Sequence, residues 1–214
     1  MRIGFIGIGV MGFPMAGHLS LNGFDVCIFN RSQEKASNWV TQFNGIMCNS
    51  PSDMASQCDI IILCVGKDED VKDVICGENG ILKSIKPGTI IIDHTTTSAT
   101  LAKDMNQILQ DKKAYFLDAP ISGGQAGAEE GKLSVMVGGD KQAFIKVKDI
   151  LGAYSKFVKY MGSSGSGQLT KMVNQICIGG LLQALAEGIN FSEKAGLNTE
   201  DVMEVITKGA AQSW

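Results

Sequence analysis

The first twelve residues combine a short, mostly apolar run with closely spaced glycines. The run Arg2–Ile6 leads directly into a six-residue turn, and a helix is predicted to follow from Pro14. The turn consists of Gly7, Ile8, Gly9, Val10, Met11 and Gly12. In such a pattern the first glycine permits a sharp turn, the second leaves room for a pyrophosphate, and the third lets the helix pack on the strand. Free amides and the dipole at the helix N-terminus favour phosphate, so the pattern predicts a dinucleotide site.

The residues after the second predicted strand indicate which dinucleotide would bind. An NAD site usually has an acidic residue about 20 residues after the glycines, where it binds the ribose 2′-hydroxyl. This chain has Asn30, Arg31 and Ser32 there instead. A guanidinium with amide and hydroxyl donors beside it binds a 2′-phosphate, so we expect NADP(H) to be preferred over NAD(H). The alternative is that Arg31 is a solvated loop residue and Ser32 the N-cap of a helix over 33–43.

From residue 1 to about 160 the chain alternates predicted strands and helices. The run 59–65 has no polar alternation, so we expect a strand buried on both faces, as parallel strands are. Repeated units of this size predict an α/β fold with a doubly wound, Rossmann-type sheet over a domain spanning 1–162. Ligands of such sheets bind at the carboxyl ends of the strands, so segments 64–65, 93–97 and 118–124 are expected at one edge.

A stretch rich in glycine and serine, Gly162–Gly167, follows this predicted domain. Its composition is that of a flexible linker, and its position also suits a hinge between domains. From Gln168 apolar residues recur at helical intervals, which predicts one long helix ended by Gly196. A further helix is expected over 200–208. Residues 163–214 are therefore interpreted as the incomplete beginning of an all-helical substrate and dimerisation domain.

The composition favours an enzyme over a nucleic-acid or membrane protein. The 214 residues carry 19 basic and 22 acidic side chains, intermixed, for a net charge of −3. No apolar run reaches the roughly 18 residues of a membrane span and no signal sequence is recognised, so we expect a cytoplasmic protein without a membrane partner. The six cysteines show no CxxC pair and no histidine at ligand spacing, which predicts mostly buried thiols and no metal site.

Four stretches of the chain together carry a resemblance to a known family. They are GFIGIGVMGFPMA at 4–16, DHTTT at 93–97, DAPISGG at 118–124 and GSGQLTKMVN at 165–174. In this order and spacing the chain resembles, over its whole length, the 3-hydroxyacid dehydrogenase family, which includes 3-hydroxyisobutyrate dehydrogenase and tartronate semialdehyde reductase. The resemblance implies an oxidoreductase that moves a hydride between NAD(P)(H) and a small 3-hydroxy acid or semialdehyde.

The resemblance also implies roles for individual residues. The family's catalytic lysine falls on Lys171, and its substrate-carboxylate site falls on Ser122, Gly123 and Gly124. Cofactor contacts are implied for three further residues: Cys64, Val65 and Thr96.

Two departures from the family pattern matter. Many members have two asparagines after the lysine, whereas this chain has Asn174 and then Gln175, a variant that resembles tartronate semialdehyde reductases, which implies tartronate semialdehyde as substrate and leaves open which amide touches substrate. The family's helical domain also runs well beyond position 214 and includes a further cofactor-contacting lysine and much of the dimer interface. We therefore expect an apparently truncated chain that forms a homo-oligomer when full length.

Elementary chemistry agrees with these implied roles. Hydride transfer to an aldehyde leaves an alkoxide, and an ammonium such as that of Lys171 can supply its proton. Burial beside an oxidised nicotinamide would lower the pKa of the amine from its usual value of about 10.4. On a helix, Asn174 and Gln175 lie one turn from Lys171 and can orient the amine or the substrate. Bare amides at Gly123 and Gly124 suit a carboxylate.

Other interpretations remain open. A non-catalytic NADP(H)-binding or sensing module would keep the glycine turn without turnover. A methyltransferase cofactor could also occupy a glycine turn, although it calls for an acidic residue where Arg31 stands. His18 is interpreted as a packing or surface residue and Asp118 as a turn stabiliser, while His94 lies at the predicted cofactor edge.

Overall fold

The computed structural model describes residues 1–43 and 45–212. The chain divides into two compact units, Met1–Lys171 and Met172–Trp214. The boundary expected from the sequence lies at 162, and the last two residues of the second predicted domain, 213 and 214, lie outside the described part.

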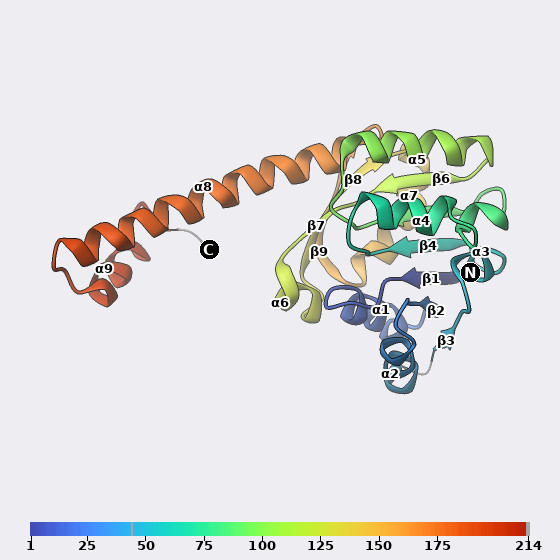
Figure 1. Cartoon of the computed structure of the whole chain (residues 1–214), viewed down its shortest axis with the longest axis horizontal. Helices are drawn as coiled ribbons and strands as arrows, with labels where there is room; N and C mark the ends of the chain where they lie inside the picture. Colours follow the sequence, from blue (N-terminus) through green and yellow to red (C-terminus); the bar gives the residue numbers. More distant parts are fainter. Residues whose placement is uncertain (44, 213–214) are drawn as a thin grey trace. The chain divides into compact units, whose positions relative to one another are not determined.

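Strands of the first unit form one sheet, shown in Figure 1. Its order is β3-β2-β1-β4-β5-β6-β8-β7, with β9 also paired to β8. The six strands from β3 to β6 are parallel and follow the 3-2-1-4-5-6 order of dinucleotide-binding folds, which confirms the predicted doubly wound sheet. The strands are β1 (Arg2–Ile6), β2 (Asp25–Phe29), β3 (Ile46–Met47), β4 (Ile60–Leu63), β5 (Ile90–Asp93), β6 (Tyr115–Asp118), β7 (Ile121–Ser122), β8 (Leu133–Gly139) and β9 (Ser155–Gly162).

Helices alternate with these strands along the chain (Figure 1). Those of the first unit are α1 (Gly12–Leu21), α2 (Gln33–Phe43), α3 (Pro51–Ala55), α4 (Asp68–Cys76), the 3₁₀ turn η1 (Ile81–Lys83), α5 (Ala99–Asp111), α6 (Gly124–Glu129) and α7 (Lys141–Gly152). The short elements β7, η1 and α6 were not predicted, because two to six residues carry too little periodicity to be recognised. The N-terminal ends of α3, α5 and α7 are capped by Ser50, Ser98 and Asp140. Each of these side chains accepts a hydrogen bond from a backbone amide in the first turn of its helix.

The core lies on both faces of the sheet. Within β4, Ile60 and Ile62 belong to one apolar cluster while Ile61 and Leu63 belong to the other, and all four are buried. Side chains of α1, α2 and α7 complete the first cluster, and those of α3, α4 and α5 complete the second. An uninterrupted apolar strand is therefore what this position between two helical layers requires.

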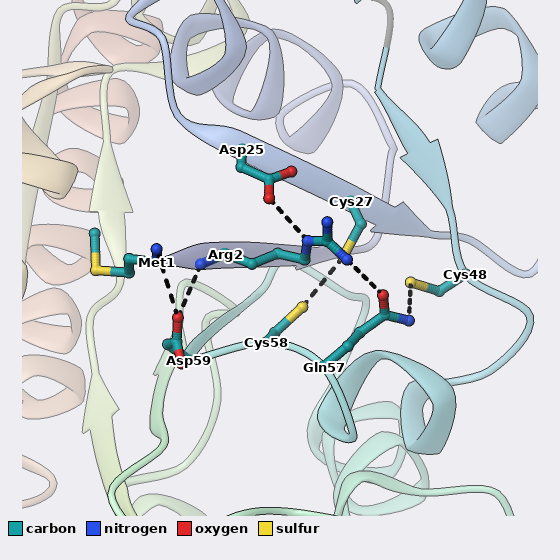
Figure 2. A network of polar contacts seen from close by, with 8 residues as sticks. All are labelled: Met1, Arg2, Asp25, Cys27, Cys48, Gln57, Cys58 and Asp59. Carbon is teal, nitrogen blue, oxygen red and sulfur yellow. Dashed lines mark hydrogen bonds and ion pairs between the residues drawn. The ribbon is translucent and has the colours of Figure 1, made fainter.

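Polar contacts join the amino ends of β1, β2 and β4, at the opposite end from the glycine turn. The Arg2 guanidinium donates to Asp25 Oδ2 and to Gln57 Oε1, both at 2.9 Å, as Figure 2 shows. Beside it the Cys27 and Cys58 sulfurs lie 3.2 Å apart as free thiols. The prediction of mostly buried thiols holds for Cys27, Cys48 and Cys58, whereas Cys64 is half-buried and Cys76 and Cys177 are exposed.

Helix α8 (Ser166–Lys194) begins in the first unit and continues into the second, where α9 (Thr199–Ile206) follows. Gly196 adopts φ +71° after α8, and Asn198 Oδ1 accepts amides of the first turn of α9. By length and composition alone, α8 is apolar enough to cross a membrane, contrary to the expectation from the sequence. Core helices of soluble proteins pass the same test of length and composition.

Candidate cofactor and catalytic site

The glycine turn is built by close approach of backbone to backbone. Gly7 has φ +97°, and a Cβ there would collide with the carbonyl of Cys64. A Cβ on Gly12 would collide with the carbonyl of Gly7, whereas the position of a Cβ on Gly9 has no described atom within 4 Å. Gly7 and Gly12 are thus needed to form the turn, whereas Gly9 leaves the space beside the turn open.

A cavity of about 580 Å³ lies against this turn. Nine of the predicted cofactor residues line it: Gly7, Gly9, Val10, Met11, Gly12, Asn30, Arg31, Cys64 and Val65. The side chain of Ile8 is instead buried, and its amide donates to Asn30 Oδ1 at 3.0 Å, so Asn30 also holds the turn in place. Ser32 and Thr96 are exposed and lie outside the cavity lining.

Several acidic and amide side chains that line the cavity were not predicted. Arg31 Nη1 lies 3.2 Å from Asp70 Oδ1, with the Arg31 side chain 82% exposed and that of Asp70 19% exposed. Asp70 is in the first turn of α4, where the helix dipole stabilises a carboxylate. The other unpredicted polar lining residues are Asn49, Ser50, Asp73, Glu78 and Asn79. The sequence signal for these side chains was the acidic first turn of the helix predicted after residue 67, now α4.

The segment after β5 is anchored on both sides of Thr96. Thr95 Oγ1 accepts from the amide of Val65 at 3.1 Å, and the amide of Thr95 donates to Asp93 Oδ1 at 2.9 Å. Thr95 and Thr97 are buried, so Thr96 is the exposed residue between them. Burial raises the pKa of Asp93 to about 7, and its Oδ2 has no hydrogen-bond partner among the described residues.

The two histidines have structural contacts. His94 is buried, its Nδ1 is 2.6 Å from the carbonyl oxygen of Ala119, and its Nε2 is 2.8 Å from Tyr154 Oη. Burial lowers the pKa of His94 to about 4, which keeps the ring neutral near pH 7. His18 Nε2 is 3.1 Å from the carbonyl oxygen of Ala128, at α6.

The Gly/Ser stretch before Lys171 is an ordered turn, so its interpretation as a flexible linker is wrong. The amides of Gly165 and Gln168 donate to the buried Asp118 carboxylate at 2.8 and 3.0 Å. Asp118 thereby stabilises a turn, as expected, but the turn belongs to a distant segment. Lys171 follows within the first two turns of α8 and is 9% exposed. Burial lowers the pKa of its amine.

The predicted substrate-carboxylate residues fall at β7, and the two amides predicted to act with Lys171 fall in the second unit. Ser122 is half-buried at the end of β7, and Gly123 (φ +137°) and Gly124 (φ +63°) are exposed. In the second unit the side-chain amide of Asn174 donates to Gln175 Oε1 at 3.1 Å.

Comparison with known proteins gives concordant matches. Residues 2–162 match the family described as the NAD binding domain of 6-phosphogluconate dehydrogenase, and residues 165–214 match the one described as NAD-binding of NADP-dependent 3-hydroxyisobutyrate dehydrogenase. An oxidoreductase of Shewanella frigidimarina is 52% identical over 213 residues, which is 100% of this chain and 73% of that protein. The 2-(hydroxymethyl)glutarate dehydrogenase of Eubacterium barkeri is 33% identical over 100% of this chain and 71% of its own length. A solved Mycobacterium tuberculosis 3-hydroxyisobutyrate dehydrogenase with L-serine has a TM-score of 0.89 at 30% identity, covering 100% of this chain and 72% of that one.

Proposed function

This chain belongs to the family of NAD(P)-dependent 3-hydroxyacid dehydrogenases, and from that premise we propose that it transfers a hydride between NADP(H) and a short 3-hydroxy acid or its semialdehyde. The observation that carries the proposal is a buried lysine, Lys171, on a helix start that is bonded to the carboxyl end of β6. In a doubly wound sheet that edge is where ligands bind.

The cavity beside the glycine turn fits the adenosine and pyrophosphate part of a dinucleotide. Gly9 leaves the cavity side open, and the turn leads into α1, whose first amides suit phosphate. Asn30, Arg31 and Ser32 follow β2, and the Arg31 guanidinium supports a preference for the 2′-phosphate of NADP(H). The family that residues 165–214 match is described by its NADP-dependent 3-hydroxyisobutyrate dehydrogenase, which supports the same preference. Ile8 would contribute its backbone, and Thr96 would meet the cofactor at the strand edge.

Lys171 would hold and move the proton. When bound, the nicotinamide ring supplies or accepts the hydride. The Lys171 ammonium gives a proton to the oxygen of the reduced aldehyde, and the neutral amine takes it back in the oxidation direction. The lowered pKa of Lys171 lies closer to neutral pH, which makes it easier for the amine to change between its charged and neutral forms. Asn174 or Gln175 would orient the amine or the substrate oxygen.

The substrate would be fixed by its carboxylate. The hydroxyl of Ser122 and the exposed backbone at Gly123 and Gly124 can bind a carboxylate without steric obstruction. The relatives support the class: 2-(hydroxymethyl)glutarate and L-serine both carry a hydroxymethyl group beside a carboxylate-bearing carbon. Tartronate semialdehyde is our first candidate, on the strength of Gln175, ahead of methylmalonic semialdehyde, succinic semialdehyde and glyoxylate. A homo-oligomeric state, a cytoplasmic location and the lack of nucleic-acid and membrane partners stay predictions.

A screen of these four aldehydes with NADPH and with NADH tests the proposal, following the absorbance of the reduced nicotinamide. We expect turnover with NADPH, and a loss of about a hundredfold or more in kcat for Lys171→Met. Thr170→Ala, one residue away and half-buried, is the matched control and should keep its activity. Tight NADPH binding without turnover of any aldehyde would favour the alternative of a non-catalytic cofactor-binding module. Normal kcat in Lys171→Met would refute the role of the lysine.

A further inference from the structure

The first turn of α8 is capped by a side chain from another element. Asp118, at the end of β6, is fully buried; its Oδ1 accepts from the amide of Gly165 and its Oδ2 from the amide of Gln168. Helix starts are usually capped by the residue just before them. Here the cap is 50 residues away from Gln168 in the chain, so the helix start is joined to the sheet.

The first turn of α8 packs so closely on the sheet that there is no room for a side chain between them. A Cβ on Gly167 would lie 2.5 Å from the carbonyl oxygens of both Asp118 and Met136. A Cβ on Gly138 would lie 2.6 Å from Asp118 Oδ1 and 2.8 Å from the amide nitrogen of Gly167. The helix start therefore lies directly against the backbone of β6 and β8.

Gln168 connects this helix start to the segment on both sides of Thr96. Its Oε1 accepts from the amide of Thr97 at 3.1 Å, and its Nε2 donates to the carbonyl of Thr95 at 2.7 Å. The side chain is fully buried. A side-chain amide donates from its nitrogen and accepts at its oxygen, so Gln168 satisfies a buried backbone carbonyl and a buried backbone N–H at once.

We propose that Gln168 is a positioning residue, which holds Lys171 and the exposed Thr96 in one fixed arrangement. Residues three apart on a helix lie on the same face, so the face of α8 that carries Gln168 against the sheet also carries Lys171. The inference rests on the proposed function, in which Lys171 exchanges the proton and Thr96 contacts the cofactor. Without this bridge the Asp118 cap still holds the helix start, but the Lys171 amine is free to turn toward solvent.

The test compares Gln168→Met, which keeps the volume and loses both hydrogen bonds, with Gln168→Glu, which keeps an acceptor for Thr97. NMR of protein labelled in its lysine side chains gives the pKa of the Lys171 amine directly, with Lys171→Arg identifying the resonance. Hydrogen exchange of the Thr97 amide reports on the bridge. Both readouts need neither cofactor nor substrate. Thr170→Ala, which removes a hydroxyl that donates to the carbonyl of Ser166 within the helix, is the matched control.

In Gln168→Met we expect the pKa of Lys171 to rise toward that of a solvated lysine and the Thr97 amide to exchange at least tenfold faster. With cofactor and substrate, kcat should fall by about ten- to a hundredfold while the dissociation constant of NADPH changes less. Gln168→Glu should give slower Thr97 exchange than Gln168→Met. Because its carboxylate would itself raise the pKa of a nearby ammonium, only its Thr97 exchange and its kcat are read if the methionine variant does not fold. Unchanged Lys171 titration and Thr97 exchange in the folded variant would overturn the inference. A shifted pKa with unchanged kcat would support the bridge and refute the proton-transfer role of Lys171, so the two proposals fail separately.

Discussion

Arg31 and Asp70 meet across the rim of the cofactor cavity, with Nη1 of the arginine 3.2 Å from Oδ1 of the aspartate. The pair joins the end of β2 to the first turn of α4, which are adjacent in space and 39 residues apart in sequence. The cation expected to bind a 2′-phosphate is thus already paired with a carboxylate in this structure.

We predict that Arg31→Ala weakens NADP+ binding about tenfold, because it removes a charge-assisted hydrogen bond from a largely exposed side chain. NAD+, which has no 2′-phosphate, should bind almost as before. Isothermal titration calorimetry with both cofactors gives the two affinities. Lys35→Ala, an exposed cation on α2 outside the cavity lining, is the control. Equal losses for NADP+ and NAD+ would contradict the assigned role.

Asp70→Asn should strengthen NADP+ binding about threefold and leave NAD+ binding unchanged. The carboxylate competes with the phosphate for the guanidinium, and exposed ion pairs of this kind contribute only a small free energy. Asp73→Asn makes the same charge change in the same cavity without breaking the pair with Arg31, and its effect should be smaller. An equal gain in both variants would show that net cavity charge, and not the ion pair, sets the affinity.

Gly9 and Gly12 should respond differently to the same added methyl group. Gly9→Ala places a Cβ into open space on the cavity side, so the melting temperature should not change. The affinity for NADP+ should fall at least tenfold, because the methyl group occupies the space where the pyrophosphate would approach the backbone. Gly12→Ala drives a Cβ into the carbonyl of Gly7, which should lower the free energy of unfolding by about 1–3 kcal/mol. Thermal unfolding and cofactor titration of both variants check the pair. A Gly9→Ala protein as destabilised as Gly12→Ala would mean that Gly9 serves the fold.

Local pattern was sufficient to predict most of the fold. The residues of β4 are apolar without interruption because helices cover both faces of the sheet, and Ser50 and Ser98 precede helices that they cap. The glycine turn was recognisable because its spacing is itself a backbone requirement.

The contacts that assemble the site could not be predicted in this way. Gln168 binds Thr95 and Thr97 across 73 and 71 residues, and nothing near Gln168 in the chain indicates those partners. Glycine and serine at 162–167 indicated flexibility by composition, whereas Gly167 is there because a side chain would collide with β6 and β8. Such close approach depends on the completed fold, and composition alone does not distinguish it from a linker.

Asp93 should make the protein less stable as the pH rises. Burial raises its pKa to about 7 from an ordinary value of 3.8, so the folded state holds the proton over a range in which the unfolded state releases it. The stabilising contribution of this group is therefore fully present below about pH 4 and is lost by about pH 7. The loss is at most about 4 kcal/mol, since each pKa unit corresponds to about 1.4 kcal/mol.

Asp93→Asn removes this titration while its Oδ1 can still accept the amide of Thr95, because the other carboxyl oxygen has no partner in the described chain. We expect the free energy of unfolding of the variant, relative to the native protein, to increase between pH 4 and pH 7. Urea unfolding at several pH values measures it. His94, whose pKa is lowered to about 4, affects stability with the opposite sign between its folded value and about 6.5, but it is common to both proteins and cancels in the difference. Parallel stability curves for the two proteins would show that the pKa of Asp93 in the folded state stays at its ordinary value.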